Sequence, residues 1–323
     1  MLGGMITGTP LVFADDHEEC EFPVEVTDTT GETIVIEEEP TAIVTLAPSA
    51  AQTLWEIGAF EKVVGLSMHA MSLEGAEDRV DISADPGSID VEAVVDLEPD
   101  LVFAPNVTPR SEIESLRELG VTVYHAEINH DLDDVMEKTL TKGELVGECE
   151  GAQETVDDMQ ARLDAIEAEL ADTDERPLAF YEMGDGFTAG GATFQHVALE
   201  QAGVTNLAAE VGIDLWEPIS AEVLIDEDPA WIIHPEYVTE DDFLEATSGI
   251  TAFETGQIIT VSANNISQPA PRIVDAIETI HVGVHGELED PAGADEPSPI
   301  PGFTAVLAVI AAAIFALVAV RRR

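Results

Sequence analysis

The sequence predicts an α/β protein built from two similar lobes with a cleft between them. Two segments, residues 89–105 and 219–235, repeat one pattern at a constant offset along the chain. Each copy holds an unbroken apolar run, which is typical of parallel strands because both of their faces are covered. A long helical pattern over residues 150–172 separates the two copies, so we expect this helix to join the lobes.

The duplicated unit reads IDVEAVVDLEPDLVFAP in its first copy and ISAEVLIDEDPAWIIHP in its second. Each copy opens with a residue that can cap a helix, Asp90 or Ser220. A short amphipathic helix follows, with Glu92 or Glu222 in its first turn, and a proline-bounded turn leads into the apolar run. The unit therefore predicts a helix followed by a buried strand in each lobe.

Alternation, apolar runs and helix-ending glycines predict the other elements. In the first lobe these are a hairpin over 22–36, strands over 42–46, 62–66 and 121–125, and helices over 50–57, 111–119 and 131–146. In the second lobe they are strands over 177–181 and 256–261, a loop over 182–191, a helix over 194–202 and a last helix starting at 268–272. The predicted domains are an N-terminal lobe (22–146), a bridging helix (147–173) and a C-terminal lobe (176–285).

The charge balance is extreme, with 66 acidic residues against 12 basic ones and a formal net charge of −54. Such self-repulsion opposes a compact state unless salt screens it, and the Debye length falls to about 3 Å at 1 M salt. The acidic residues are spread through periodic, apolar-rich segments, which does not indicate a disordered tail. We expect a halophilic source, and no nucleic-acid partner because phosphates would be repelled.

The chain has two cysteines, Cys20 and Cys149, and neither has the spacing of a zinc site. We therefore expect no bound metal. An exported protein favours a disulfide between them, and two free thiols remain the alternative.

Both ends carry features of an exported, anchored protein. Residues 1–14 resemble a signal peptide that ends at Val12-Phe13-Ala14. An acidic, proline-rich linker (286–300) precedes an apolar run over 303–320, which could span about 27 Å, and three arginines that suit a cytoplasmic flank. Residues 301–323, from Pro-Gly-Phe onward, resemble the PGF-CTERM sorting signal of archaeal surface proteins. That resemblance implies a tail replaced by a lipid; a plain transmembrane anchor is the alternative, and both place the body on the extracellular face of the membrane.

Four segments carry a wider resemblance: VTLAPSAAQTLWEIGAFEKVVGLS (44–67), VEAVVDLEPDLVFAP (91–105), TAGGATFQHVALEQAG (188–203) and PAPRIVDAI (269–277). Together with the opening hairpin, they make most of residues 22–284 similar to the binding proteins of cobalamin and iron-siderophore ABC importers. The resemblance implies two Rossmann-like lobes bridged by one rigid α-helix, with ligand held between the lobes. It implies neither catalysis nor a cofactor.

The resemblance also assigns roles to two glutamates. In such proteins one glutamate on each lobe contacts arginines of the permease, and the matching positions are Glu92 and Glu222. Two carboxylates on two lobes could bind a two-fold permease, with its ATPase, through charge-assisted hydrogen bonds. A solvated first-turn glutamate, favoured by the helix dipole, is the alternative.

Ligand contacts are predicted from loop position. Trp216 is the leading candidate, since the family often stacks an aromatic there on a macrocycle or catecholate. The full set is Ser49, Met68, His69, Asn106, Phe187, Trp216 and Arg272. Pro105 stands where a cobalamin binder would have an aromatic residue, and the arginines are scattered. The ligand, a corrinoid or a ferric siderophore, therefore stays open.

A surface-anchored α/β enzyme, such as a hydrolase or a metal chelatase, is the competing function. The motifs GxSxG and HExxH and a glycine-rich phosphate loop are missing from the sequence. A surface-layer or adhesion protein would show threonine-rich stalks or β-repeats, and neither is visible. We expect the extracytoplasmic substrate-binding component of an ABC importer.

Overall fold

The computed structural model describes residues 20–85, 88–126, 131–171, 173, 175–243, 245–286 and 288. The described residues from 20 to 286 belong to one compact unit. The predicted signal peptide (1–14) and the predicted PGF-CTERM tail (301–323) lie outside the described residues. Among the helices that are described, none is both long and apolar enough to cross a membrane.

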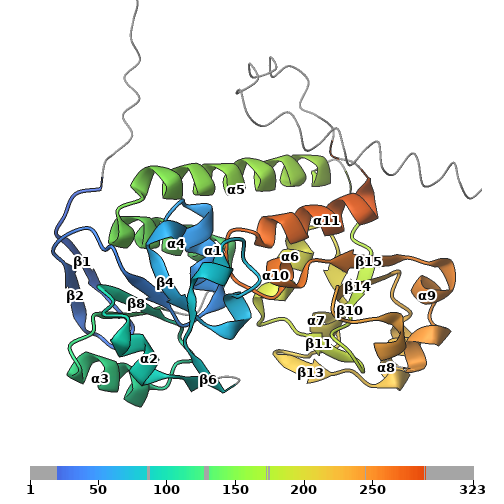
Figure 1. Ribbon diagram of the computed structural model, residues 1–323. Coiled ribbons are helices and arrows are strands. Elements are labelled where there is room, and N and C mark those ends of the chain that lie inside the picture. Colours follow the sequence, from blue (N-terminus) through green and yellow to red (C-terminus); the bar gives the residue numbers. More distant parts are fainter. Residues whose placement is uncertain are drawn as a thin grey trace, which may run out of the picture. The chain divides into compact units, whose positions relative to one another are not determined.

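The N-terminal lobe is built on a five-stranded parallel sheet in the order β5-β4-β3-β8-β9. Figure 1 labels β4 and β8 of this sheet. Its strands are β3 (Ile43–Thr45), β4 (Val63–Leu66), β5 (Val80–Asp81), β8 (Leu101–Ala104) and β9 (Val123–His125). The four helices around the sheet are α1 (Pro48–Glu56), α2 (Val91–Asp96), α3 (Arg110–Glu118) and α4 (Leu132–Val146).

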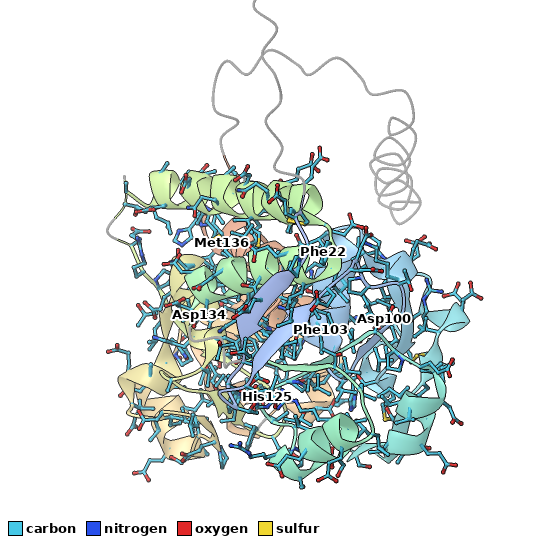
Figure 2. All side chains as sticks on the ribbon, turned by 90° about the vertical axis from the view of Figure 1, so that its left-hand side faces the viewer. Phe22, Asp100, Phe103, His125, Asp134 and Met136 are labelled. Carbon is cyan, nitrogen blue, oxygen red and sulfur yellow. A yellow bond between two sulfur atoms is a disulfide. The ribbon has the colours of Figure 1, made fainter. Side chains whose placement is uncertain are left out.

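Helices cover both faces of this sheet, and successive side chains of a strand point to opposite faces, so a strand such as β8 contributes to two cores. On β8, Leu101 and Phe103 enter the core with α1 and α4, whereas Val102 and Ala104 enter the core with α2 and α3. Phe103 packs edge-on against Tyr124 of β9, with ring centroids 5.9 Å apart. Figure 2 labels Phe103 among the side chains of this lobe. The unbroken apolar run in the sequence therefore predicted the strand correctly.

Two antiparallel pairs complete this lobe. The hairpin of β1 (Val24–Thr27) and β2 (Thr33–Ile36) confirms the alternation over 22–36. The second pair is β6 (Ser83–Asp85) with β7 (Ser88–Ile89), which the sequence did not predict. Short 3₁₀ segments lie at Phe60–Lys62, Met68–Ala70 and Ala76–Asp78.

The C-terminal lobe has a four-stranded parallel sheet in the order β12-β10-β14-β15. Its strands are β10 (Leu178–Tyr181), β12 (Thr205–Asn206), β14 (Trp231–Pro235) and β15 (Ile258–Val261). Its helices are α6 (Phe194–Gln201), α7 (Leu207–Glu210), α8 (Ala221–Glu227), α9 (Thr251–Thr255), α10 (Ala263–Ile266) and α11 (Ile273–His285), with 3₁₀ segments at Glu240–Asp242 and Glu245–Gly249.

The predicted loop over 182–191 is wrong in part. Phe187–Ala189 forms strand β11, which pairs antiparallel with β13 (Trp216–Pro218). The glycines and acidic residues around this strand indicated a loop. The strand forms because it pairs with β13, which lies far along the chain, rather than through local propensity. The ribbon β11-β13 carries two of the predicted ligand contacts.

Helix α5 (Cys149–Leu170) connects the two lobes. Its 22 residues give a rod of about 33 Å, and it contacts α1 and α4 of the N-terminal lobe and α6 and α11 of the C-terminal lobe (Figure 1). Residues Met159, Leu163, Ile166 and Leu170 are buried along one face. The two-lobed, helix-bridged fold is thus confirmed, while the exact domain boundaries stay a prediction.

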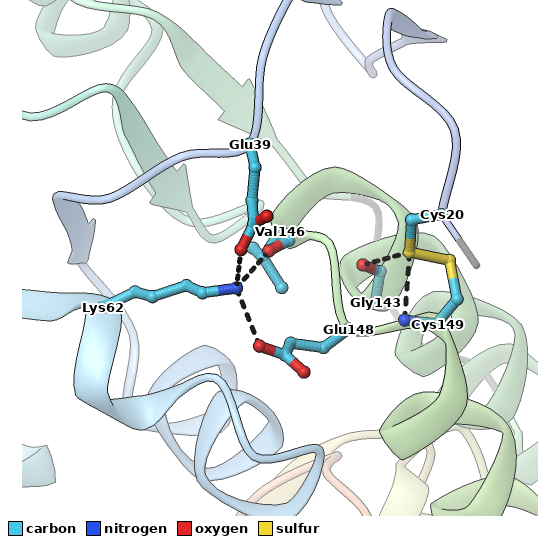
Figure 3. Close-up of a disulfide and its surroundings, with 7 residues drawn as sticks. All are labelled: Cys20, Glu39, Lys62, Gly143, Val146, Glu148 and Cys149. Atoms are coloured by element: carbon cyan, nitrogen blue, oxygen red, sulfur yellow. Dashed lines mark hydrogen bonds and ion pairs between the residues drawn. A yellow bond between two sulfur atoms is a disulfide. The ribbon is translucent and has the colours of Figure 1, made fainter.

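The start of α5 is fixed by a disulfide and an ion-pair cluster (Figure 3). Cys20 and Cys149 are bonded, with Cα atoms 5.5 Å apart. Nearby, Lys62 Nζ lies 2.7 Å from carboxylate oxygens of Glu39 and Glu148 and donates to the carbonyl of Val146 at 2.7 Å. Although burial alone would lower it, these carboxylates raise the pKa of Lys62.

Candidate functional site

The carboxyl ends of the two parallel sheets face each other. Helix α1 follows the end of β3, and α10 follows the end of β15. Gln52 Nε2 on α1 donates to the backbone oxygen of Asn264 on α10 at 3.1 Å, so these two edges meet. In open α/β sheets, ligands bind in the crevice outside the carboxyl ends of the strands. This junction is therefore where a ligand site is expected.

Large apolar side chains remain exposed around these strand ends. Met68, which follows β4, and Phe187 and Trp216 on the β11-β13 ribbon are each 41% exposed. Trp216 pairs with Ala189, two residues from Phe187, so Phe187 and Trp216 lie on the same face of the ribbon. Tyr237, two residues beyond β14, is 56% exposed. Together these side chains could cover an extended apolar surface of a ligand.

Several buried polar oxygens at the same strand ends have no hydrogen-bond partner among the described residues. They are Thr45 Oγ1 on β3 and Ser67 Oγ just after β4, together with Gln52 Oε1 on α1. Buried polar groups are nearly always paired, with protein, water or ligand. Thr45 and Ser67 therefore add buried hydroxyl groups, unpaired among the described residues, beside the ends of β3 and β4.

The structure brings most of the predicted contacts to these edges. Ser49 lies in the first turn of α1, and Met68 and His69 form the 3₁₀ turn after β4, where Met68 N donates to Ser83 Oγ at 2.9 Å. Asn106 is exposed just after β8. Phe187 and Trp216 belong to the opposite lobe. Sequence reasoning missed Tyr237, although an aromatic residue just beyond the second duplicated strand was a usable signal.

Arg272 differs from the other six predicted ligand contacts because its side chain binds residues of the opposite lobe. It lies immediately before α11, its guanidinium forms a close ion pair with Glu56, and it stacks over the indole of Trp55 at 4.4 Å. Both partners belong to the last turn of α1. The guanidinium is therefore already engaged by the N-terminal lobe.

The other cations of the body are engaged as well. Every lysine and arginine in the described residues donates to a protein acceptor or pairs with a carboxylate. Arg117, for example, binds Asp28 at 2.6 Å, and Arg79 lies over the ring of Phe60. A ligand with several negative charges would need a cluster of cationic donors. In the described part of the chain each cation already has a protein partner, although single donors such as Arg79 Nε have none.

The duplicated glutamates occupy matching positions on the two lobes. Asp90 caps α2 by accepting from Ala93 N at 3.0 Å, and Ser220 caps α8 by accepting from Val223 N at 3.2 Å. Glu92 and Glu222 are therefore the second helical residues of equivalent helices, and both are exposed. Figure 1 shows α2 and α8 on the side of the lobes opposite α5.

Two parallel-sheet lobes, one rigid connecting helix and an apolar site at the facing strand ends define a ligand-binding protein of the bridged two-lobe class. Residues 43–264 match the profile of the family described as periplasmic binding protein. The chain belongs to this family, whose members are substrate-binding proteins.

Relatives and solved structures agree with this assignment. A protein named cobalamin-binding protein from Halobacterium salinarum is 38% identical over 297 residues, covering 88% of this chain and 80% of that protein. The structure of a vitamin B12-binding protein from Vibrio cholerae superimposes with a TM-score of 0.65 at 21% identity, covering 76% of this chain and 96% of the other. A heme-binding protein structure gives a TM-score of 0.69 at 19% identity, covering 87% and 95%. At these identities the structures establish the fold alone.

Proposed function

We propose that this chain is the extracytoplasmic binding component of an ABC importer and that it captures a corrinoid. The observation that carries the proposal is the group of exposed aromatic and apolar side chains at the strand ends, whereas each cation among the described residues already has a protein partner. A corrinoid offers a broad ring and no cluster of negative charge, whereas a ferric siderophore is commonly anionic. The name of the Halobacterium relative supports the corrinoid.

The proposed contacts are Ser49, Met68, His69 and Asn106 from one lobe and Phe187 and Trp216 from the other. The test is a titration of the protein in concentrated KCl with cyanocobalamin, a ferric siderophore and hemin, followed by tryptophan fluorescence. Saturable quenching by cyanocobalamin alone is expected. Tight binding of the siderophore or hemin instead would overturn the corrinoid assignment, and turnover of any of the three would favour an enzyme.

The Trp216→Ala variant tests the stacking role. We expect its Kd for cyanocobalamin to rise about tenfold, equivalent to about 1.4 kcal/mol. Leu215→Ala is the matched control, because Leu215 is 50% exposed and adjacent in sequence but precedes the paired strand. Equal losses in the two variants would argue against a specific stacking contact.

Glu92 and Glu222 are proposed to bind the permease. The double change Glu92→Gln and Glu222→Gln is expected to leave ligand affinity unchanged and to reduce uptake in cells. Glu227→Gln, an exposed glutamate at the end of α8, is the control. Normal uptake by the double variant would contradict docking through these carboxylates.

The proposed location is the outer face of the cell membrane of a halophile. A signal peptide over 1–14 would export the chain, and the PGF-CTERM-like tail, or a lipid that replaces it, would hold it there. Mass spectrometry of the mature protein tests both. A mature chain that retains residues 301–323 would exclude lipid replacement and favour a transmembrane anchor.

A further inference from the structure

Arg272 links the two lobes through a contact that is separate from the exposed aromatic residues. Its guanidinium pairs with Glu56 and stacks on Trp55. The side chain of Arg272 is only 29% exposed and that of Glu56 only 23%. An arginine is suited to this role because its planar group can bind a carboxylate and stack on a ring at once. Partial burial shields the pair from the concentrated salt that screens exposed charges.

A second contact lies one turn earlier on the same face of α1. Gln52 donates to the backbone oxygen of Asn264, and Asn264 Nδ2 donates to Ser72 Oγ at 3.2 Å. Gln52 and Glu56 are four residues apart, so both project toward the C-terminal lobe. We call Gln52, Trp55, Glu56, Asn264 and Arg272 the inter-lobe clamp.

Ion pairs with the bridging helix α5 hold the start of α11, next to Arg272. Arg162 of α5 donates to Asp275 Oδ1 at 2.7 Å and to the two carboxylate oxygens of Glu278 at 2.8 and 2.6 Å. Asp275 and Glu278 lie in the first two turns of α11, directly after Arg272. The bridging helix therefore holds the start of α11 in place, and Arg272 reaches from there to α1.

Charged side chains line the space between α1 and α11 at this point. A pocket of about 310 Å³ lies between α1, α5 and the start of α11, and its lining includes Glu56, Asp158, Arg162 and Arg272. Arg272 reaches across this junction to Glu56 and Trp55 on α1.

We propose that Arg272 is a positioning residue for ligand binding, which sets the separation of the two lobes through Glu56 and Trp55. Helix α1 carries Ser49 in its first turn and Glu56 at its end, so a shift at the clamp moves a proposed ligand contact. This inference rests on the proposed function and replaces direct ligand contact as the role of Arg272. If loss of the clamp leaves one tenth of the molecules at the binding-competent spacing, the apparent Kd rises tenfold.

The experiment measures lobe separation and affinity independently. Spin labels are attached through Glu118→Cys on α3 and Glu227→Cys on α8, both exposed positions. Arg272→Gln is expected to broaden the inter-lobe distance distribution and to raise the Kd for cyanocobalamin about tenfold. The charge-reversed pair Glu56→Arg with Arg272→Glu is expected to recover part of both losses.

Arg110→Gln is the matched control, because it removes an exposed ion pair to Glu114 within α3 and should change neither quantity. If Arg272→Gln does not fold, Glu56→Gln tests the same contact from the other lobe. An unchanged distance distribution would overturn the proposal, and a raised Kd without broadening would show direct ligand contact instead. Broadening with an unchanged Kd would also overturn it. If the wild-type protein binds no corrinoid, the proposed function fails, while the label distances still decide whether the clamp sets lobe separation.

Discussion

The Arg117→Met substitution is expected to destabilise the N-terminal lobe strongly. Asp28, at the turn of the β1-β2 hairpin, has a fully buried side chain. Its carboxylate accepts from Thr30 N at 2.8 Å, Thr30 Oγ1 at 2.6 Å, Arg117 Nη2 at 2.6 Å and His125 N at 3.1 Å. The substitution removes the only full positive charge in this group and leaves a buried carboxylate without a counterion.

Removing one partner of a buried ion pair costs about 3–5 kcal/mol. Thr30 and His125 still donate to Asp28 in the variant, so we expect about 3 kcal/mol. At about 2.1 cal/mol/K of unfolding entropy per residue, a loss of this size corresponds to a Tm lower by about 4–6 °C. Urea unfolding in concentrated KCl, followed by tryptophan fluorescence, measures the free energy of unfolding directly.

The pH dependence gives a second readout. Burial raises the pKa of Asp28, but the hydrogen bonds from Thr30, Arg117 and His125 outweigh it and hold the pKa below its usual value. The ionised group therefore stabilises the folded state above the unfolded pKa, and this contribution is lost as pH falls through the folded pKa. Without Arg117 the folded pKa rises, so acid unfolding is expected to begin at a higher pH.

A double-mutant cycle provides the decisive control. Asp28→Asn removes the buried charge, so adding it to Arg117→Met should recover part of the loss. Arg110→Met, at an exposed pair within α3, should cost at most about 1 kcal/mol. The reasoning is refuted if Arg117→Met costs less than about 1 kcal/mol or if the losses of the two single variants simply add.

Three further predictions concern stability. Cys20→Ser opens a disulfide that closes a long loop, and we expect a loss of up to about 5 kcal/mol in the free energy of unfolding; reduction of the wild-type protein with dithiothreitol should match it. Gly151→Ala should lower the Tm measured by calorimetry, although alanine favours helices, because its Cβ would lie 2.1 Å from the backbone oxygen of Ile57. Gly249→Ala is the control, since a Cβ at Gly249 would have no atom within 4 Å, and it should leave the Tm unchanged. Burial, with a smaller effect of the nearby Lys138, lowers the pKa of Lys142 from 10.5 to about 8. Between these pH values the unfolded chain binds more protons than the folded one, so the free energy of unfolding of the wild-type protein should rise as the pH increases. Lys142→Met should abolish that rise and, at pH 7, add about 2–3 kcal/mol to the free energy of unfolding.

Local patterns accounted for most of the fold. The duplicated segments predicted α2 with β8 and α8 with β14, because helix caps and buried strands leave signals within a few residues. The helical spacing over 150–172 predicted α5 almost to its ends. Short strands such as β11 were missed, because pairing with distant β13 stabilises them.

For the site, the sequence by itself determined which residues follow the strands and that the surface is acidic. It also supplied the matching glutamates, Glu92 and Glu222. Only the tertiary structure decided which face of the β11-β13 ribbon carries Phe187 and Trp216, and that Arg272 pairs with Glu56 on the other lobe. Periodicity and capping are encoded locally, whereas register between distant strands and the partner of a long charged side chain depend on how separate elements pack.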